Sequence, residues 1–312
     1  MSSIDWLDAI DFERLGLNPN AVSDQAEERR ILDLVQSLSA EDTTNRDQYD
    51  SERAVEIYRN FLNWLFATFK TRESEFRHTA LSILELQPGQ RVLITSCGLG
   101  EDVELCAAQV GSTGFVHAQD LSRIFVEHAR DAVTHDQCAF TVSNALDLPY
   151  KDNFFDAVYH FGGINLFGNL QRAVHEMTRV CKTGGTVVFG DESVAPHLRD
   201  HDYGKMFICN NALWEAPLPL DALPITAHNV SARYLLGNCF YQIAFQKGEG
   251  TPDVDIDIPH ISHRGGSVRT RYFGTLEGVS EAAKARLYEY ARAKDMSVSD
   301  ALDQLIRRLD ED

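Results

Sequence analysis

The stretch Arg91-Val-Leu-Ile-Thr-Ser-Cys-Gly-Leu-Gly-Glu-Asp102 decides how this chain folds. An apolar run leads into the glycines Gly98 and Gly100, and residues with helical spacing follow them. A second apolar run, Val116-His-Ala-Gln-Asp-Leu-Ser122, contains the acid Asp120 at its end. This order predicts a strand, a tight glycine turn, a helix, and a second, parallel strand that ends in a carboxylate.

The turn and the acid together have the features of a nucleoside-binding site. Glycine lacks a Cβ atom, so a ligand can approach the backbone closely at Gly98 and Gly100. A carboxylate after the second strand can accept hydrogen bonds from the two hydroxyl groups of a ribose. We therefore expect an adenosine-containing cofactor to bind at residues 92–120.

Strands and helices continue to alternate along the chain after this unit. The alternation predicts an α/β fold with a doubly wound, mostly parallel, Rossmann-like sheet. Gly237-Asn238 predicts a hairpin between the last two strands, which gives a seven-stranded sheet. The predicted strands are 91–95, 115–119, 138–142, 155–161, 185–190, 228–236 and 239–246, and the predicted helices are 100–109, 121–133 and 169–181.

Residues 1–85 are expected to form a helical lid in front of a cofactor-binding domain at 86–248. The apolar spacing predicts a helical face around residues 32–38 and an aromatic-rich helix at 55–69, with a polar loop at 40–49 between them. The bulky residues of the aromatic helix fit two interpretations, packing against the domain and walling a substrate pocket. Both can hold, because a lid must pack as well as cover.

The C-terminal residues are expected to form a separate small unit. An acidic linker is predicted at 249–266, and Ser267-Val-Arg-Thr-Arg-Tyr-Phe273 is predicted to be a strand. Two helices are predicted at 280–291 and 297–307, and each begins with a serine in the position of an N-cap. Residues 267–312 therefore form a predicted strand-helix-helix unit.

The composition limits the classes of protein that this chain can belong to. A net charge of −18 argues against a surface that binds nucleic acid or an anionic membrane throughout. A run of about 18 apolar residues is lacking, so no membrane span is expected, and the acidic N-terminus differs from a signal peptide. The six cysteines contain no CxxC pair, which favours free thiols, a cytoplasmic location and the absence of a metal site.

With these segments in order, residues 85–247 resemble the class I S-adenosylmethionine-dependent methyltransferases, particularly the group around the ubiquinone and menaquinone methyltransferases. In that family the first strand carries an acid and continues into Gly-x-Gly-x-Gly. Gly98 and Gly100 match the second and third glycines. Ile94 stands in place of the acid, and Ser96 in place of the first glycine.

The resemblance implies that the cofactor is S-adenosylmethionine. Asp120 aligns with the family's ribose-binding acid, and Asn144-Ala145 lies in the segment that usually contacts the adenine. The acid that Ile94 replaces helps to organise the amino acid end of the cofactor in the family. Either Glu101 or Asp102 takes over that task, or the site has weakened or changed its ligand. The implied cofactor-binding residues are Thr95, Cys97, Gly98, Gly100, Asp120, Leu121, Asn144, Ala145 and His160.

Candidate catalytic residues follow the fourth and fifth strands, where an open α/β sheet binds ligands. His160 is predicted to be a general base because imidazole titrates near neutral pH. The alternative is a packed histidine at the strand end. Asp191 is the second predicted catalytic residue, with a structural cap or a metal ligand as alternatives. Further candidates are Asn165, Glu192, Tyr58 and His197.

Residues 267–309 resemble a ribbon-helix-helix unit of the Arc/MetJ type. Such units pair one strand from each of two chains, and the strands can enter the DNA major groove. The resemblance implies a homodimer formed through this unit. DNA binding is the alternative, and the negative net charge of the chain disfavours it. The basic residues near the expected strand are Arg264, Arg269 and Arg271.

The sequence leaves three functions open. The first is an enzyme that transfers a methyl group to a small hydrophobic or aromatic molecule, and Gly98, Gly100 and Asp120 support it. The others are a regulatory dimer that senses a ligand and a non-methylating enzyme on the same fold. The changes at Ile94 and Ser96 favour these two. An assay for the demethylated cofactor separates the first function from the others.

Overall fold

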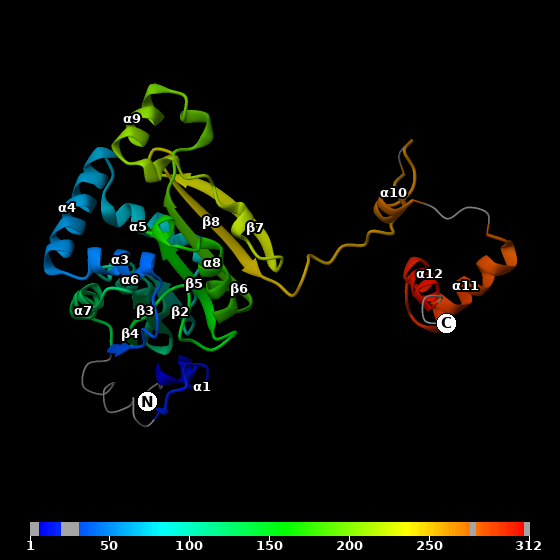
Figure 1. Cartoon of the computed structure of the whole chain (residues 1–312), viewed down its shortest axis with the longest axis horizontal. Helices are drawn as coiled ribbons and strands as arrows, with labels where there is room; N and C mark the ends of the chain where they lie inside the picture. The colour runs from blue at the N-terminus through cyan, green and yellow to red at the C-terminus, as the bar shows by residue number, and fades with distance from the viewer. Residues whose placement is uncertain (1–5, 20–30, 262, 275–278, 309–312) are drawn as a thin grey trace. The chain divides into compact units, whose positions relative to one another are not determined.

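The computed structural model describes residues 6–19, 31–261, 263–274 and 279–308. The chain splits into two compact units, Met1–Pro252 and Asp253–Asp312. Figure 1 shows the first unit as a twisted sheet with helices on its faces and the second unit as a group of short helices.

One sheet organises the first unit. Among the described residues, eight strands are hydrogen-bonded in the order β1-β4-β3-β2-β5-β6-β8-β7. β1 to β6 run parallel, and β8 and β7 add an antiparallel hairpin at one edge. The mostly parallel α/β prediction is confirmed, but the sheet has one strand more than the seven expected. The strands are β1 Ile31–Asp33, β2 Arg91–Thr95, β3 Phe115–Asp120, β4 Cys138–Val142, β5 Phe155–Phe161, β6 Cys181–Glu192, β7 Ala227–Leu235 and β8 Phe240–Lys247.

Helices cover both faces of the sheet (Figure 1). α5, α6 and α7 pack on one face through a cluster that includes Leu81, Val103 and Val126. α8 and the N-terminal residues pack on the other face through Val174 and Ile10. The helices are α1 Phe12–Leu15, α3 Ala40–Tyr49, α4 Glu52–Thr68, α5 Glu73–Leu81, α6 Glu101–Val110, α7 Arg123–Ala132, α8 Leu170–Val180 and α9 Asp202–Asn210. Short 3-10 turns are η1 Trp6–Ala9, η2 Ser82–Leu84, η3 Gly111–Thr113, η4 Ile164–Leu166, η5 Pro196–Leu198, η6 Ala212–Glu215 and η7 Leu220–Ala222.

The parallel pairing sets the place where ligands can bind. Thr95 pairs with Gln119 on β3 and with His160 on β5, so the carboxyl ends of these three strands lie next to one another. The loops that follow the strands therefore meet at one edge of the sheet. In open α/β sheets this edge forms the ligand-binding crevice.

Two N-terminal predictions are wrong. Ile31–Asp33 is a strand rather than part of a helix, because its backbone pairs in parallel with β4 and two of its side chains are buried. The polar stretch at 40–49 is helix α3 rather than a loop. Ser39 Oγ accepts a hydrogen bond from the Asp42 N–H and caps its first turn, which satisfies a backbone donor that a helix start leaves free. Helix α4 confirms the predicted aromatic helix.

The second unit differs from the prediction in its first element. Its helices are α10 Val268–Phe273, α11 Glu281–Ala293 and α12 Val298–Arg307. The strand predicted at 267–273 is wrong, because a capping box between Ser267 and Thr270 begins α10 there. The two helices that follow are confirmed. Without the strand, the structure does not support the ribbon-helix-helix resemblance.

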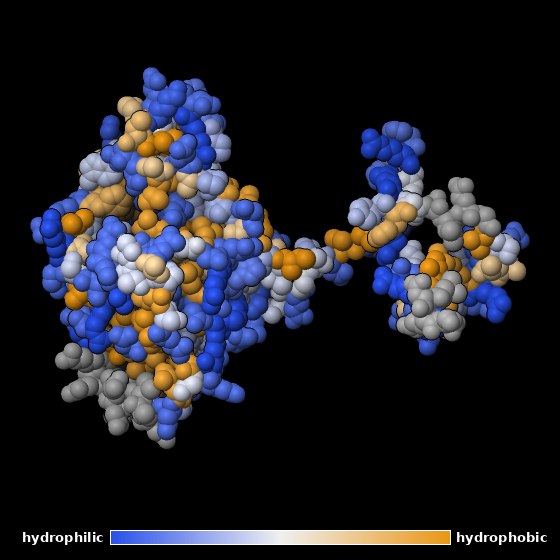
Figure 2. Space-filling view, in the orientation of Figure 1, coloured by the Kyte–Doolittle hydropathy of each residue, from blue (hydrophilic) through white to orange (hydrophobic). Residues whose placement is uncertain are grey.

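The surface of the second unit carries large apolar side chains (Figure 2). Val268, Tyr272 and Phe273 of α10 are 63%, 83% and 74% exposed. Arg269, which the sequence placed near a DNA-binding strand, pairs instead with Asp257 at 2.9 Å and Asp300 at 3.3 Å. This arginine is therefore engaged within the unit itself.

The six cysteines all lie within the described residues, and all are free thiols. Cys209 on α9 is exposed, and the others are buried. Burial raises the pKa of Cys181 to about 12, so this thiol stays protonated at neutral pH. In the described part of the chain, no helix is both long enough and apolar enough to cross a membrane.

Candidate functional site

A cavity of about 440 Å³ lies at the carboxyl ends of the central strands, within the range of about 300–1,000 Å³ that is typical of small-molecule sites. Residues of α3, α4 and α5 complete its wall. From α3 and the strand ends, the lining includes Asp42, Tyr49, Ser96, Gly98, Gln119, Asp120, Leu121, Asn144 and Ala145. Its apolar lining includes Phe61, Leu62, Leu65, Phe66, Phe76, Phe161, Leu213, Leu236 and Phe240.

The glycine turn after β2 forms part of this cavity wall. Gly98 has a φ of 56°, and a Cβ atom there would lie 3.3 Å from the Tyr58 hydroxyl. Gly100 has a φ of 94°, and its Cβ would lie 3.1 Å from Ala129 Cα. Gly98 therefore keeps the cavity open at the turn, whereas Gly100 lets α6 begin close to α7. Gly100 is not among the residues that line the cavity.

Asp120 ties the end of β3 to the glycine turn. Its Oδ2 accepts a hydrogen bond from the Gly98 N–H at 3.1 Å, and its Oδ1 accepts one from the Ser122 N–H at 2.9 Å. Burial raises the pKa of Asp120 to about 6, although these backbone donors lower it. The structure thus brings the predicted acid and the predicted turn together, with the carboxylate facing the cavity.

Asn144 and Ala145 line the cavity at the end of β4. Asn144 Oδ1 accepts the N–H of Leu146 at 2.9 Å, and its Nδ2 donates to Asp42 at 3.3 Å. Asp42 comes from α3 and is 6% exposed. A carboxylate that the sequence placed in a loop is therefore next to the predicted adenine segment.

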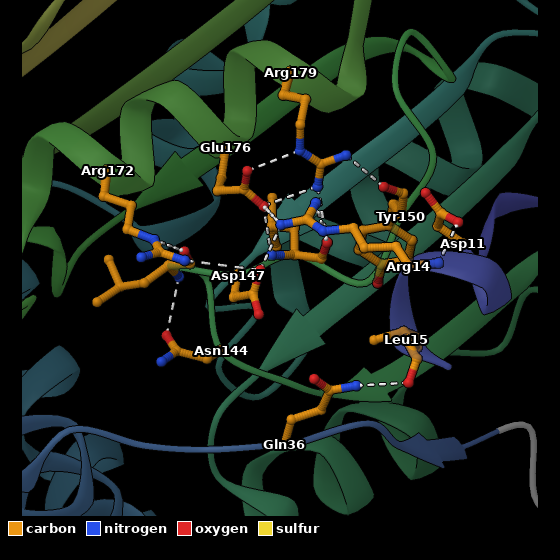
Figure 3. Close-up of polar contacts among 12 residues, drawn as sticks. Asp11, Arg14, Leu15, Gln36, Asn144, Asp147, Tyr150, Arg172, Glu176 and Arg179 are labelled. Carbon is orange, nitrogen blue, oxygen red and sulfur yellow. Dashed lines mark hydrogen bonds and ion pairs between the residues drawn. The ribbon is translucent and has the colours of Figure 1, made fainter. Parts of the chain in front are cut away.

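A network of ion pairs fixes the rest of this segment (Figure 3). The Leu148 N–H donates to Glu176 at 2.8 Å, and its carbonyl accepts from Arg179 at 2.8 Å. Arg14 of α1 joins the network through Asp147 at 2.5 Å and Glu176 at 3.2 Å. Charge-assisted hydrogen bonds of this kind, most of them partly buried, hold backbone in one position. These contacts position the backbone at Asp147 and Leu148, which directly follows the cavity wall at Asn144 and Ala145.

Three predicted site residues are buried away from the cavity. Thr95 Oγ1 and His160 Nδ1 are 3.0 Å apart, and both residues are fully buried. Burial lowers the pKa of His160 to about 4, so its imidazole is neutral at pH 7. The ring also packs on Phe167 with centroids 5.4 Å apart. Cys97 is buried, and burial raises the pKa of its thiol well above the usual value. For His160 these contacts favour the packed alternative.

Asp191 and Glu192 form a carboxyl pair at the end of β6. Asp191 is fully buried and accepts N–H bonds from Asn165 at 2.7 Å and from Glu192 at 2.9 Å. Glu192 lines the cavity. Burial and the neighbouring Asp191 raise the pKa of Glu192 well above its usual value. Asp191 therefore caps the loop, while Glu192 presents an acid to the cavity.

The aromatic helix both packs and lines the cavity, as the two sequence interpretations allowed. Tyr58, Phe61 and Phe66 of α4 belong to the lining. Phe66 also packs on Phe76 with centroids 5.6 Å apart, and Phe76 packs on Phe161 at 5.2 Å. Burial raises the pKa of Tyr58, so its hydroxyl stays neutral.

Sequence reasoning missed several polar residues of the lining, among them Asp42, Tyr49 and Arg77. Arg77 lies on α5 and is only 9% exposed. A single arginine within a helical pattern gives no signal of its own, because most arginines are exposed. Among the residues that the structure describes, no group of three His, Cys, Asp or Glu side chains is arranged to hold a metal ion.

Comparison with known proteins relates this geometry to a family. Residues 93–189, from β2 into β6, match the family model described as a methyltransferase domain. The demethylmenaquinone methyltransferase of Bacillus mycoides (strain KBAB4) is 28% identical over 167 residues, which cover 53% of this chain and 62% of that protein. The enzyme of the same name from Bacillus cereus (strain B4264) gives the same identity and coverage. The match therefore spans less than two thirds of these relatives.

Two solved structures share the fold. Phosphoethanolamine N-methyltransferase 2 from Haemonchus contortus, in complex with S-adenosyl-L-methionine, has a TM-score of 0.52 at 14% identity and covers 68% of this chain and 61% of its own. Its complex with phosphomonomethylethanolamine and S-adenosylhomocysteine has a TM-score of 0.51 at 13% identity, with coverages of 65% and 60%. Residues 93–189 are therefore similar to a methyltransferase domain, and the chain shares its fold with a solved methyltransferase structure.

Proposed function

We propose that this chain transfers the methyl group of S-adenosylmethionine to a small hydrophobic or aromatic molecule. The observation that carries the proposal is one cavity lined both by the Gly98 turn with Asp120 and by the aromatic residues of α4 and α5. Direct transfer between two bound molecules requires that both lie in one space at a fixed distance. A polar region and an apolar region in the same cavity meet that requirement.

The residues at the strand ends fit an adenosyl group. A carboxylate offers about four lone-pair positions, and the N–H groups of Gly98 and Ser122 use only part of that capacity. Asp120 can therefore also accept hydrogen bonds from ribose hydroxyls. Asn144 and Ala145 present a side-chain amide and backbone to the adenine, and Gly98 gives the cofactor access to the turn.

When bound, S-adenosylmethionine supplies a methyl group that its sulfonium already activates for in-line displacement. Asp120 and the Gly98 turn would hold this cofactor, and the aromatic wall would hold the acceptor beside it. The apolar wall excludes water and aligns the acceptor, and such positioning is worth about 7–11 kcal/mol. Where the acceptor atom carries a proton, the ionised form of Glu192 would take it, an effect of about 10²–10⁴-fold.

The aromatic lining indicates the class of acceptor. Flat or apolar molecules gain most from burial against Phe61, Phe76 and Phe161. An acceptor with an aromatic ring and a hydroxyl group would match both the apolar lining and the acid Glu192. The relatives are named demethylmenaquinone methyltransferases, and a quinone is a flat molecule that would suit this wall.

The changed positions Ile94 and Ser96 favour a second candidate, a ligand-sensing or non-methylating protein on the same fold. The predicted homodimer and the DNA alternative depended on the strand at 267–273, and they do not form part of the proposed function. The cytoplasmic location stays a prediction.

The proposed function is tested by incubating the full chain with S-adenosylmethionine and a panel of small acceptors. We expect S-adenosylhomocysteine to form with apolar aromatic hydroxyl compounds and not with small hydrophilic amines, because only the former match the cavity wall. Mass spectrometry of the acceptor then shows a gain of one methyl group. Cofactor binding without any transfer across the panel would favour the sensing candidate.

Binding of the cofactor should depend on pH through Asp120. Because the pKa of this carboxyl is raised to about 6, it is ionised above pH 6 and protonated below it. The ionised form accepts the ribose hydroxyls, so affinity for S-adenosylhomocysteine should fall about tenfold from pH 7 to pH 5. Calorimetric titration at both values measures this change. The variant Asp120→Asn should lose the pH dependence, and a flat response in the unchanged chain would contradict the assignment.

A further inference from the structure

One cluster of charged residues beside the glycine turn has no place in the mechanism above. It consists of Arg77 on α5 with its carboxylate partners Glu73, Glu101 and Asp102, and we call it the Arg77 cluster. We propose that this cluster binds the amino acid end of the cofactor, with the Arg77 guanidinium paired to the α-carboxylate. The inference rests on the proposed function and deepens it.

The first observation is that the end of β2 has no acid to hold this part of the cofactor. Ile94 occupies that position and is 2% exposed, in an apolar cluster with Val92 and Tyr159. The two ionic groups of the amino acid end still need partners, because burying an unpaired charge is costly. Those partners must therefore come from another element.

The second observation is that Arg77 is a buried cation on the cavity wall. It is 9% exposed and lines the same cavity as Ser96 and Gly98. Its Nε donates to Glu73 at 2.8 Å, its Nη2 lies 2.6 Å from the same carboxylate, and its Nη1 lies 3.0 Å from Asp102. Guanidinium has five N–H donors, so these three contacts leave capacity for a further anion. The two carboxylates also fix the plane of the fork.

The third observation places the cluster next to the glycine turn. The Tyr58 hydroxyl lies 3.3 Å from where a Gly98 Cβ would stand. The charges of Arg77, Glu101 and Asp102 all shift the pKa of the Tyr58 hydroxyl. Tyr58 thus lies between the turn and the cluster. Asp120, the Gly98 turn and Arg77 line one cavity, so a cofactor whose ribose binds Asp120 would share that space with Arg77.

The fourth observation is a surplus of negative charge that suits an ammonium group. Arg77 faces three carboxylates, with Glu101 at 3.6 Å in addition to Glu73 and Asp102. Within the described residues, the buried Oδ1 of Asp102 has no hydrogen-bond partner. An unsatisfied buried acceptor is destabilising, and an ammonium group bound beside the cluster would supply a donor. The cluster therefore offers Arg77 on the cavity wall for the carboxylate, and behind it a surplus of negative charge, outside the cavity lining, that attracts the ammonium.

Binding of three ligands can distinguish a direct contact between Arg77 and the α-carboxylate from a purely structural role of Arg77. S-adenosylhomocysteine carries both ionic groups, its decarboxylated form carries the ammonium alone, and 5′-methylthioadenosine carries neither. In the full-length variant Arg77→Gln, calorimetry should show affinity for S-adenosylhomocysteine reduced about 10- to 100-fold. The affinities for the other two ligands should change less than about threefold, since they lack the group that Arg77 binds. The matched control Arg72→Gln alters an exposed arginine at the start of the same helix and should leave all three affinities unchanged.

A second variant covers the case in which Arg77→Gln does not fold. Asp102→Asn should weaken S-adenosylhomocysteine and its decarboxylated form while sparing 5′-methylthioadenosine, because only the first two carry the ammonium. Arg77→Lys should restore part of the lost affinity, since lysine keeps the charge without the fork. Equal losses for all three ligands, or no loss for S-adenosylhomocysteine, would overturn the proposal. If the unchanged chain binds none of the three, the proposed function fails together with this inference.

Discussion

The variant Asp120→Ala is expected to bind S-adenosylhomocysteine at least about 100-fold more weakly than the unchanged chain. Hydrogen bonds to a charged group contribute about 1.5–3 kcal/mol each, and the carboxylate is placed to accept two from a ribose. The substitution also removes the Oδ2 atom that accepts a hydrogen bond from the Gly98 N–H at 3.1 Å. This bond ties the glycine turn to the end of β3. Isothermal titration calorimetry measures the loss directly.

Two comparisons show whether this loss belongs to the ligand contact. Asp131→Ala removes an exposed acid on α7 that pairs only with its neighbour Arg130 among the ion pairs described, and it should leave affinity unchanged. A thermal unfolding curve of Asp120→Ala should remain cooperative, because the side chain bridges loops at the sheet edge and is not part of the apolar core. An affinity within threefold of the unchanged chain would remove Asp120 from the site.

The variant Glu192→Gln should lose about 10²–10⁴-fold in turnover with an aromatic hydroxyl acceptor. Glutamine keeps the shape of the side chain but cannot take up the proton that leaves the acceptor. Affinity for S-adenosylhomocysteine should stay the same, since Asp120 and the Gly98 turn are untouched. Initial rates of methyl transfer, measured at saturating cofactor, test the split between turnover and binding.

The pH profile adds a second signature of Glu192. Burial and Asp191 raise the pKa of Glu192, so the ionised base forms at a higher pH than for an ordinary glutamate. Turnover of the unchanged chain should therefore rise with pH through that transition, and Glu192→Gln should lack this rise. The exposed Glu215 serves as a control, because Glu215→Gln removes an equal charge outside the cavity lining. Unchanged turnover in Glu192→Gln would show that Glu192 is not the general base.

The elements with strong local signals were predictable from sequence. Long apolar runs that end in glycine, such as the one before Gly98, specify both a strand and its turn. Ile31–Asp33 was missed because three residues are too few to show a period, and their pairing with β4 is a tertiary contact. Helix α3 was missed because its residues are polar, and its cap at Ser39 was the one local signal.

The candidate site was predictable where it follows from topology. Parallel strands bring their carboxyl ends to one edge, so Asp120 and Asn144 could be placed together in advance. The sequence could not show which face of β5 meets the cavity. Alternation along the strand puts His160 and Phe161 on opposite faces, and Phe161 is the one that lines the cavity. Arg77 comes from a helix whose position depends on packing.

The distribution of the thiols makes this chain ready for site-specific labelling. Since Cys209 is the exposed cysteine and the other five are shielded, a maleimide dye should attach at a single position without prior mutagenesis. Cys209 lies on α9, two residues from Phe207, whose ring stacks on Phe69 of the α4 end at 5.2 Å. A fluorophore there would report on movements of α9 against the end of α4 while acceptors enter and leave the cavity.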